Sequence, residues 1–314
     1  MPTDPLPSWN EGAAKARFVD FVRRVTTEAT PDFVPAPDRI AVFDNEGTLW
    51  PEQPICIQFV FAFDRLKALA HVHPELKKIE PFRTVLEGGL NILVTFDADQ
   101  IIEIIKATQS GMSTEQFSDI VAAWIATAKD PRFGRFYTEL VYQPMLELLD
   151  YLRANEFKSF IVSGTGADFI RVFAEETYRI PPEQVVGSTT VVEFTLGETG
   201  PMLMKIPEVE VLSDGAGKPV AIDRFIGRRP IFAFGNSDGD KEMLVWTAAG
   251  AGPHLVGLLH HTDAKREWAY DRDSKVGRLD KALDLAGIKD WTIVDMATDW
   301  NRVFPPPRDA VETG

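Results

Sequence analysis

Short apolar runs bounded by turn residues recur along the chain, and each is typical of a strand that is buried on both faces. The first run covers residues 40–43, and later runs cover residues 160–162, 185–188, 231–234, 255–259 and 292–294. Helical or irregular segments separate them, and strands that alternate with helices predict a doubly wound, mostly parallel α/β sheet. Residues 189–211 alternate between apolar and polar positions around two glycines, which predicts a β-hairpin.

Between the first two strands the pattern is helical instead. Apolar stripes at helical spacing fall within residues 51–141, and two of the helices open with capping signals at Asp97 and Ser113. No strand-like alternation interrupts this stretch. We therefore expect residues 51–141 to form an α-helical cap inserted after the first strand, and residues 1–50 and 142–314 to form one α/β core.

The most informative polar positions follow the first strand. Asp44 and Glu46 come directly after it and precede a Gly-Thr turn. Open α/β sheets place their chemistry at the carboxyl ends of strands, and two carboxylates two residues apart in extended backbone project to the same side. One can act as a nucleophile or metal ligand while the other transfers protons. The alternative is a turn without function, because Asp, Asn and Gly favour turns.

Three later segments near strand ends also carry polar residues. A Ser-Gly-Thr-Gly segment at 163–166 exposes backbone N–H groups that suit an anion. Lys218 lies in a Gly-rich loop from which it can reach an anion. The segment 236–240 contains clustered oxygen ligands of the kind that Mg²⁺ prefers. Each segment alone also fits an ordinary turn, a solvated lysine or a helix cap, and none matches a dinucleotide, P-loop or EF-hand pattern.

The order of these four signals resembles that of the haloacid dehalogenase superfamily, in its phosphoserine-phosphatase-like branch with a helical cap. That family has Asp-x-Asp-x-Thr, then Ser or Thr, then Lys, then an acidic loop, and the same order runs through residues 40–245 here. The resemblance implies a Rossmann-like core that carries the cap, and Mg²⁺ as the cofactor.

The resemblance also implies a role for individual residues. Asp44 would become an aspartyl-phosphate, and Glu46 would be the general acid and base, with its main-chain carbonyl on Mg²⁺. The implied catalytic residues are Asp44, Glu46, Ser163 and Lys218. The implied substrate-binding residues are Thr48, Ser163, Gly164, Thr165 and Lys218. The implied metal ligands are Asp44, Glu46, Asn236 and Asp240, with Asp238 in reserve.

Two of these positions depart from the family pattern. Glu46 stands where Asp is usual, and its carboxyl group reaches about 1.5 Å further. Asn236 stands where a metal-binding Asp is common, and a neutral amide oxygen is a weaker ligand for Mg²⁺ than a carboxylate. The first departure predicts either slower turnover or an aspartyl-phosphate that persists. For the second, we expect Asp240, or Asp238 in reserve, to supply the missing charge.

Composition narrows the classes of partner. The 314 residues carry a formal net charge of -14, which disfavours general binding to nucleic acids or to anionic membranes. A small phosphorylated substrate remains compatible if a metal supplies positive charge. The one cysteine, Cys56, excludes an intrachain disulfide, and the N-terminus lacks a signal-peptide pattern, so we expect a cytoplasmic location unless a leader was removed. Oligomeric state is not readable from the sequence.

The sequence thus predicts a Mg²⁺-dependent phosphomonoester hydrolase that forms an aspartyl-phosphate. Phosphoryl transfer and dehalogenation are the alternative reactions of the superfamily. Dehalogenation needs no metal, so the acidic loop at 236–240 argues against it. A weakly catalytic phosphate-binding or regulatory protein is the alternative from another class. The leaving group of the substrate is not encoded in any pattern.

Overall fold

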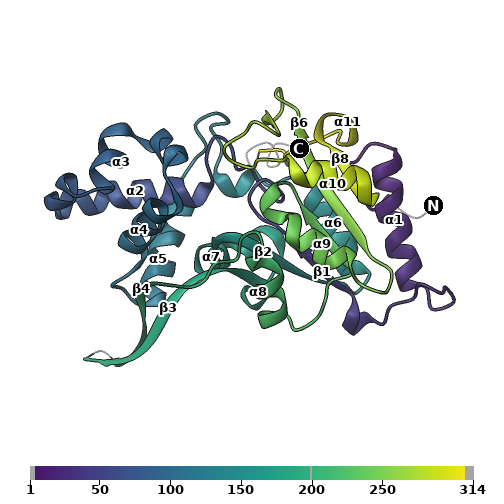
Figure 1. The fold of residues 1–314 in the computed structure, drawn as a ribbon, viewed down its shortest axis with the longest axis horizontal. Helices are drawn as coiled ribbons and strands as arrows, with labels where there is room; N and C mark the ends of the chain where they lie inside the picture. Colours follow the sequence, from purple (N-terminus) through teal and green to yellow (C-terminus); the bar gives the residue numbers. More distant parts are fainter. Residues whose placement is uncertain (1–3, 199, 308–314) are drawn as a thin grey trace.

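The centre of the computed structural model, which describes residues 4–198 and 200–307, is an eight-stranded sheet (Figure 1). The strand order is β4-β3-β2-β1-β5-β6-β7, and β8 also pairs with β6. The strands are β1 Ile40–Phe43, β2 Lys158–Gly166, β3 Val185–Gly197, β4 Gly200–Val211, β5 Phe232–Gly235, β6 Leu255–Thr262, β7 Ala269–Tyr270 and β8 Thr292–Asp295. Among the described strands, β4 runs antiparallel to β3 and β7 runs antiparallel to β6, and the other pairs are parallel. The predicted mostly parallel α/β class is therefore confirmed.

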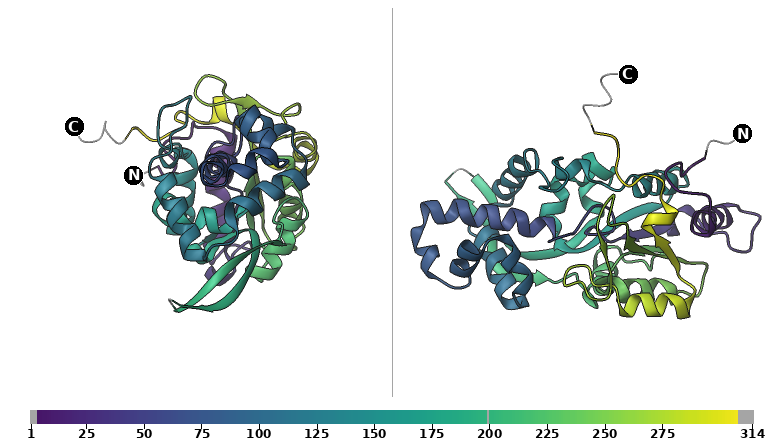
Figure 2. Two further views of the ribbon diagram at one scale, coloured as in Figure 1. Left: turned by 90° about the vertical axis from the view of Figure 1, so that its left-hand side faces the viewer. Right: turned by 90° about the horizontal axis from the view of Figure 1, so that it is seen from above.

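Helices cover both faces of the sheet, as the right-hand view of Figure 2 shows. They are α1 Ala13–Thr26, α2 Ile57–Val72, α3 Phe82–Gly88, α4 Ala98–Gln109, α5 Thr114–Ile125, α6 Gln143–Ala154, α7 Ala167–Tyr178, α8 Gly217–Phe225, α9 Lys241–Ala248, α10 Lys281–Lys289 and α11 Met296–Asp299. No described helix combines the length and the apolar composition that crossing a bilayer requires.

The central strand β1 is buried on both sides, as its unbroken apolar run predicts. Ala41 and Phe43 face one apolar cluster, which includes Phe18 of α1. Ile40 and Val42 face the other, which includes residues of α8, α9 and α10. Burying a side chain of this size contributes about 1.5–3 kcal/mol, so β1 is anchored firmly on both faces. The chain then leaves the sheet at Asp44 from a fixed position.

Residues 51–141 contain no strand and form helices α2 to α5, drawn at the left of Figure 1. Helices α2, α3 and α4 enclose their own apolar cluster, which includes Leu66, Val85 and Ile104, whereas the buried residues of α5 join the cluster of the core. The capping signals at Asp97 and Ser113 are both present as capping boxes. The helical character predicted for this segment is therefore confirmed.

The hairpin β3–β4 lies where the sequence predicted it, but it also joins the helical segment. The Gly111 N–H donates to the Lys205 carbonyl at 3.0 Å, and the Lys205 N–H donates to the Met112 carbonyl at 2.9 Å. β4 is the end strand of the sheet, and an end strand offers unpaired backbone groups. Here the connection between α4 and α5 forms hydrogen bonds with some of these backbone groups of β4.

Candidate active site

The turn after β1 is built to hold backbone and side chains tightly together. The Asp44 N–H donates to the Phe234 carbonyl of β5 at 3.0 Å, and the Asn45 carbonyl closes the turn by accepting from Leu49 at 2.9 Å. Gly47 has φ of +73°, and a Cβ there would lie 2.2 Å from Asn236 Nδ2. Only glycine combines a positive φ with the absence of a Cβ, so position 47 requires glycine. The turn that it allows fixes the backbone that carries Asp44 and Glu46.

Asp44 and Asp240 share the ammonium group of Lys218. Lys218 Nζ lies 2.6 Å from Asp44 Oδ1 and 2.5 Å from Asp240 Oδ1, and it also donates to the Val162 carbonyl at 3.0 Å. Burial and the nearby Asp240 charge raise the pKa of Asp44 to about 7, although Lys218 opposes the shift. Burial disfavours the charged lysine, but Asp240 and Asp44 outweigh it and raise the pKa of Lys218. The sequence-predicted pair of Asp44 and Lys218 is therefore in direct contact.

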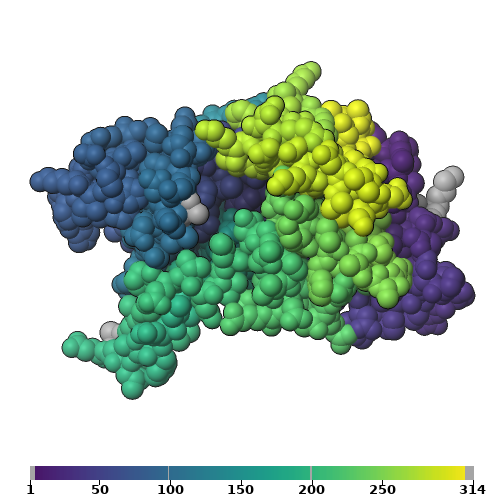
Figure 3. Space-filling view, viewed as in Figure 1, coloured from purple at the N-terminus to yellow at the C-terminus, as the bar shows by residue number. Residues whose placement is uncertain are grey.

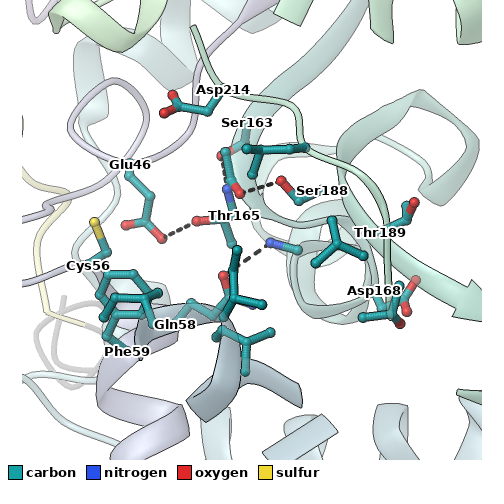
Figure 4. A pocket seen from close by; sticks show the side chains of 18 of the residues that line it. Glu46, Cys56, Gln58, Phe59, Ser163, Thr165, Asp168, Ser188, Thr189 and Asp214 are labelled. Atoms are coloured by element: carbon teal, nitrogen blue, oxygen red, sulfur yellow. Dashed lines mark hydrogen bonds between the residues drawn. The ribbon is translucent and has the colours of Figure 1, made fainter. Parts of the chain in front are cut away.

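Two hydrogen-bond donors fix the carboxyl group of Glu46 at a position that its longer side chain reaches. Trp50 Nε1 donates to Glu46 Oε2 at 2.9 Å. Thr165 Oγ1 donates to Glu46 Oε1 at 3.1 Å, as Figure 4 shows. Burial is the main cause that raises the pKa of Glu46 to about 8, so a proton is available on this carboxyl group at neutral pH. The longer side chain thus reaches two fixed donors, one of them from β2.

These groups face a cavity of about 390 Å³, within the size range of small-molecule sites. In Figure 3 the surface is hollowed between the blue helical segment and the green and yellow core. Most of the sequence-predicted residues line the cavity, namely Asp44, Glu46, Ser163, Gly164, Thr165, Lys218 and Asp240. Distant loops therefore converge at one edge of the sheet, as α/β architecture requires.

Thr48, Asn236 and Asp238 are not among the lining residues. Thr48 is fully buried, and its hydroxyl donates to Asn236 Oδ1 at 2.9 Å, so it orients the amide and makes no contact that a substrate could share. Asp238 accepts from the backbone N–H groups of Asp280 and Ala282, which places its carboxylate at the start of α10. The reserve role of Asp238 as a metal ligand finds no geometric support.

Sequence reasoning missed Glu52, a carboxylate of the cavity wall with 5% of its surface exposed. Its Oε1 accepts from Asn236 Nδ2 at 2.5 Å and from the Tyr270 hydroxyl at 2.8 Å. Burial raises the pKa of Glu52 well above its usual value, and the charges of Asp44 and Glu46 add to the shift. Glu52 follows Pro51 outside any strand, so no local pattern could have identified it.

Oxygen atoms close to Asp44 in the sequence or across the site are ligands of the kind that a hard divalent cation prefers. Among the described residues none donates a hydrogen bond to the carbonyl of Glu46, two residues after Asp44, so that oxygen is available to a ligand. Asn236 Oδ1 accepts only from Thr48 and keeps a second lone pair. The described residues contain no group of three His, Cys, Asp or Glu side chains arranged around one metal position. A site here would therefore rely on one carboxylate and on neutral carbonyl and amide oxygens, which Mg²⁺ accepts.

Two solved structures with TM-scores of 0.50 or more support the fold. A protein of unknown function from Anaerococcus prevotii has a TM-score of 0.56 at 15% identity, with 83% of this chain and 89% of that chain covered. One from Bordetella pertussis has a TM-score of 0.50 at 12% identity, with 82% and 98% covered. A phosphoserine phosphohydrolase-like protein from Francisella tularensis scores 0.42 at 15% identity, with 82% and 94% covered.

No curated protein matches the sequence. Residues 41–245, which contain the turn after β1, the Ser163 segment, Lys218 and the acidic loop, match the haloacid dehalogenase-like hydrolase family. The matched segment is more than half of the 314 residues. The chain therefore belongs to the haloacid dehalogenase-like hydrolases.

Proposed function

We propose that this protein is a Mg²⁺-dependent phosphomonoester hydrolase that works through a phosphorylated Asp44. The observation that carries the proposal is the contact between the Asp44 carboxylate and the Lys218 ammonium group, 2.6 Å apart, in the wall of a cavity that Glu46 also lines. A carboxylate fixed in this way is a nucleophile, and the other carboxyl group has donors that fix it for proton transfer.

In the first step, an Asp44 oxygen attacks the phosphorus atom and the bond from phosphorus to the ester oxygen breaks. Glu46 gives its proton to the leaving oxygen, so the product departs as a neutral alcohol. Trp50 and Thr165 hold the Glu46 carboxyl group during this transfer. The Lys218 charge and the Ser163 hydroxyl, which accepts from the Thr165 N–H and keeps its own proton to donate, compensate charge on the transferring oxygens. Such positioning and charge compensation supply most of the catalysis in phosphoryl transfer.

In the second step, Glu46 removes a proton from water, and the water oxygen attacks phosphorus. The bond between phosphorus and Asp44 breaks, and inorganic phosphate leaves. The residues that would hold Mg²⁺ are Asp44, the Glu46 carbonyl and Asn236, and the ion would reduce the repulsion between the Asp44 carboxylate and the phosphate dianion. Asp240 was predicted from the sequence as a metal ligand, but its Oδ1 accepts from Lys218 and its Oδ2 accepts from the N–H groups of Asn236 and Ser237. We therefore assign it to holding Lys218 and this loop.

We also propose that residues 51–141 act as a cap over this site and that they select the leaving group. The far wall of the cavity includes apolar side chains of Phe59, Ile101, Ile102, Ile105, Val209 and Leu212. Its two lysines are already paired, Lys205 with Asp168 and Lys218 with Asp44 and Asp240. Among the described lining residues no lysine or arginine is left to pair with a carboxylate of the substrate, which disfavours a phosphorylated amino acid.

Gln109 adds one polar feature to this wall. It is 4% exposed, and its Nε2 has no acceptor among the described residues. A buried amide of this kind is costly to leave unpaired, by about 1–3 kcal/mol. The leaving group that fits best is therefore an uncharged, largely apolar alcohol with one hydrogen-bond acceptor.

The test is hydrolysis of 4-nitrophenyl phosphate by the wild type and by Asp44→Asn, each with Mg²⁺ and with EDTA. We expect the wild type to need the cation and Asp44→Asn to lose activity by at least about 10⁴-fold, because no nucleophile remains. Circular dichroism and thermal unfolding should show an intact fold in the variant. Full activity of Asp44→Asn, or of the wild type in EDTA, contradicts the proposal.

A further inference from the structure

Glu52 is one of the acidic side chains of the cavity that take no part in the proposed reaction. Glu52 is 5% exposed and faces the same cavity as Asp44 and Glu46. Its Oε1 receives two hydrogen bonds, but no described residue donates to its Oε2. Oε2 is not fully enclosed, so it is open to water, a proton or a cation that enters the cavity.

The side chains that line the cavity include more acidic than basic groups. Its lining contains six carboxyl groups, at Asp44, Glu46, Glu52, Asp168, Asp214 and Asp240, and two lysines, at 205 and 218. Lys205 is paired with Asp168, and Lys218 lies between Asp44 and Asp240. Glu52 has no basic side chain of the described residues in contact with it. The region around Glu52 is therefore short of positive charge.

The contact with Asn236 places this excess of negative charge next to the amide that would hold the cation. Asn236 Nδ2 lies 2.5 Å from Glu52 Oε1, and Thr48 holds the other end of the amide. The two contacts orient the amide, with its nitrogen toward Glu52 and its oxygen toward Thr48. Gly47 and Gly277 keep space for the carboxylate, because a Cβ at either position would lie within 2.3 Å of Glu52 Oε1.

From this arrangement we propose that Glu52 supplies the negative charge of the Mg²⁺ site that the neutral Asn236 lacks. The proposal rests on the proposed function, since it concerns the cation used there. Glu52 and Asn236 act as a pair, in which the amide offers a neutral oxygen and the carboxylate beside it balances the charge of the ion. Glu52 is thus a positioning residue for the cation, 184 positions away from its partner in the chain.

The test measures Mg²⁺ binding by isothermal titration calorimetry and by the Mg²⁺-induced rise in melting temperature, with no substrate present. In Glu52→Gln the side chain keeps its size and loses its charge. We expect its Mg²⁺ affinity to fall about 10–100-fold, as is typical when a group behind a metal ligand is removed. The melting temperature without Mg²⁺ should stay the same or rise, because Gln cannot take the charged form that burial disfavours.

Two further variants separate charge from packing. Tyr270→Phe removes a hydrogen bond to the same Glu52 oxygen but no carboxylate, so Mg²⁺ affinity should stay within about threefold of the wild type. Asn236→Asp combined with Glu52→Gln moves the charge to the neighbouring residue and should restore wild-type affinity. If the double variant binds Mg²⁺ more than about tenfold more weakly than the wild type, the exchange of charge is contradicted.

The outcomes distinguish this inference from the function on which it rests. If Glu52→Gln binds Mg²⁺ as tightly as the wild type, the inference is wrong and the proposed function stands. A variant that melts earlier without Mg²⁺ but keeps the full Mg²⁺-induced rise would show that Glu52 is only structural. If the wild type itself binds no Mg²⁺, with or without inorganic phosphate, the Mg²⁺ dependence in the proposed function is contradicted.

Discussion

At the scale of single residues, Glu46 shows how a departure from a family pattern can be accommodated. The sequence alone suggested that a Glu in place of Asp would be misplaced by its extra length. In the structure the carboxyl group lies between Trp50 Nε1 and Thr165 Oγ1, 2.9 and 3.1 Å away. Both donors suit the longer side chain, so Glu46→Asp should separate the carboxyl group from them and slow turnover.

A proton-transfer role for Glu46 predicts an effect that depends on the leaving group. In Glu46→Gln, kcat/KM for an alkyl phosphate should fall about 10²–10⁴-fold, because an alkoxide needs a proton to leave. For 4-nitrophenyl phosphate the loss in kcat/KM should stay within about tenfold, because nitrophenolate leaves without one. An equal loss for both esters would show that Glu46 acts only through structure.

The sequence identified the residues at strand ends but not those that act through distant contacts. Asp44, Ser163 and Lys218 follow or adjoin apolar runs, so local pattern placed them at one edge of the sheet. Glu52 carries no such signal, and its partners Asn236 and Tyr270 lie 184 and 218 positions away. Contacts over such separations exist only after folding.

At the scale of elements, the helical segment and the hairpin are linked. α2 and α4 provide apolar side chains to the cavity, and β4 pairs with the connection between α4 and α5. The sequence predicted helices from 3.6-residue periodicity and the hairpin from alternation. It did not predict that they meet, because the free edge of β4 becomes a partner only in the assembled sheet.

Phe59 on α2 tests whether this segment recognises the leaving group. Phe59→Ala removes part of the apolar wall, so kcat/KM for 4-nitrophenyl phosphate should fall about tenfold, which corresponds to about 1.4 kcal/mol of lost contact. For acetyl phosphate, whose leaving group is small, the change should stay within about threefold. Phe63→Ala is the matched control, because Phe63 lies one turn further along α2 and does not line the cavity. Equal effects of the two substitutions would contradict a substrate role for Phe59.

At the scale of the whole molecule, the sheet brings together segments that are far apart in sequence. β1, β2 and β5 are adjacent and parallel, so Asp44 and Asn236 leave the sheet at the edge where Ser163 lies near the end of β2. Lys218, at the start of α8, completes the group by contact with both Asp44 and Asp240. The whole arrangement predicts covalent chemistry at one carboxylate, with all other groups in supporting roles.

The most direct measurement is rapid acid quenching during turnover of a phosphomonoester, followed by proteolysis and mass spectrometry. The account predicts an acyl phosphate on the peptide that contains Asp44, in the wild type and in Glu46→Gln, where slower activation of water prolongs it. Hydroxylamine should remove the phosphoryl group, and Asp44→Asn should show none. A phosphoryl group on any other side chain, or phosphate release by Asp44→Asn at the wild-type rate, would contradict the account.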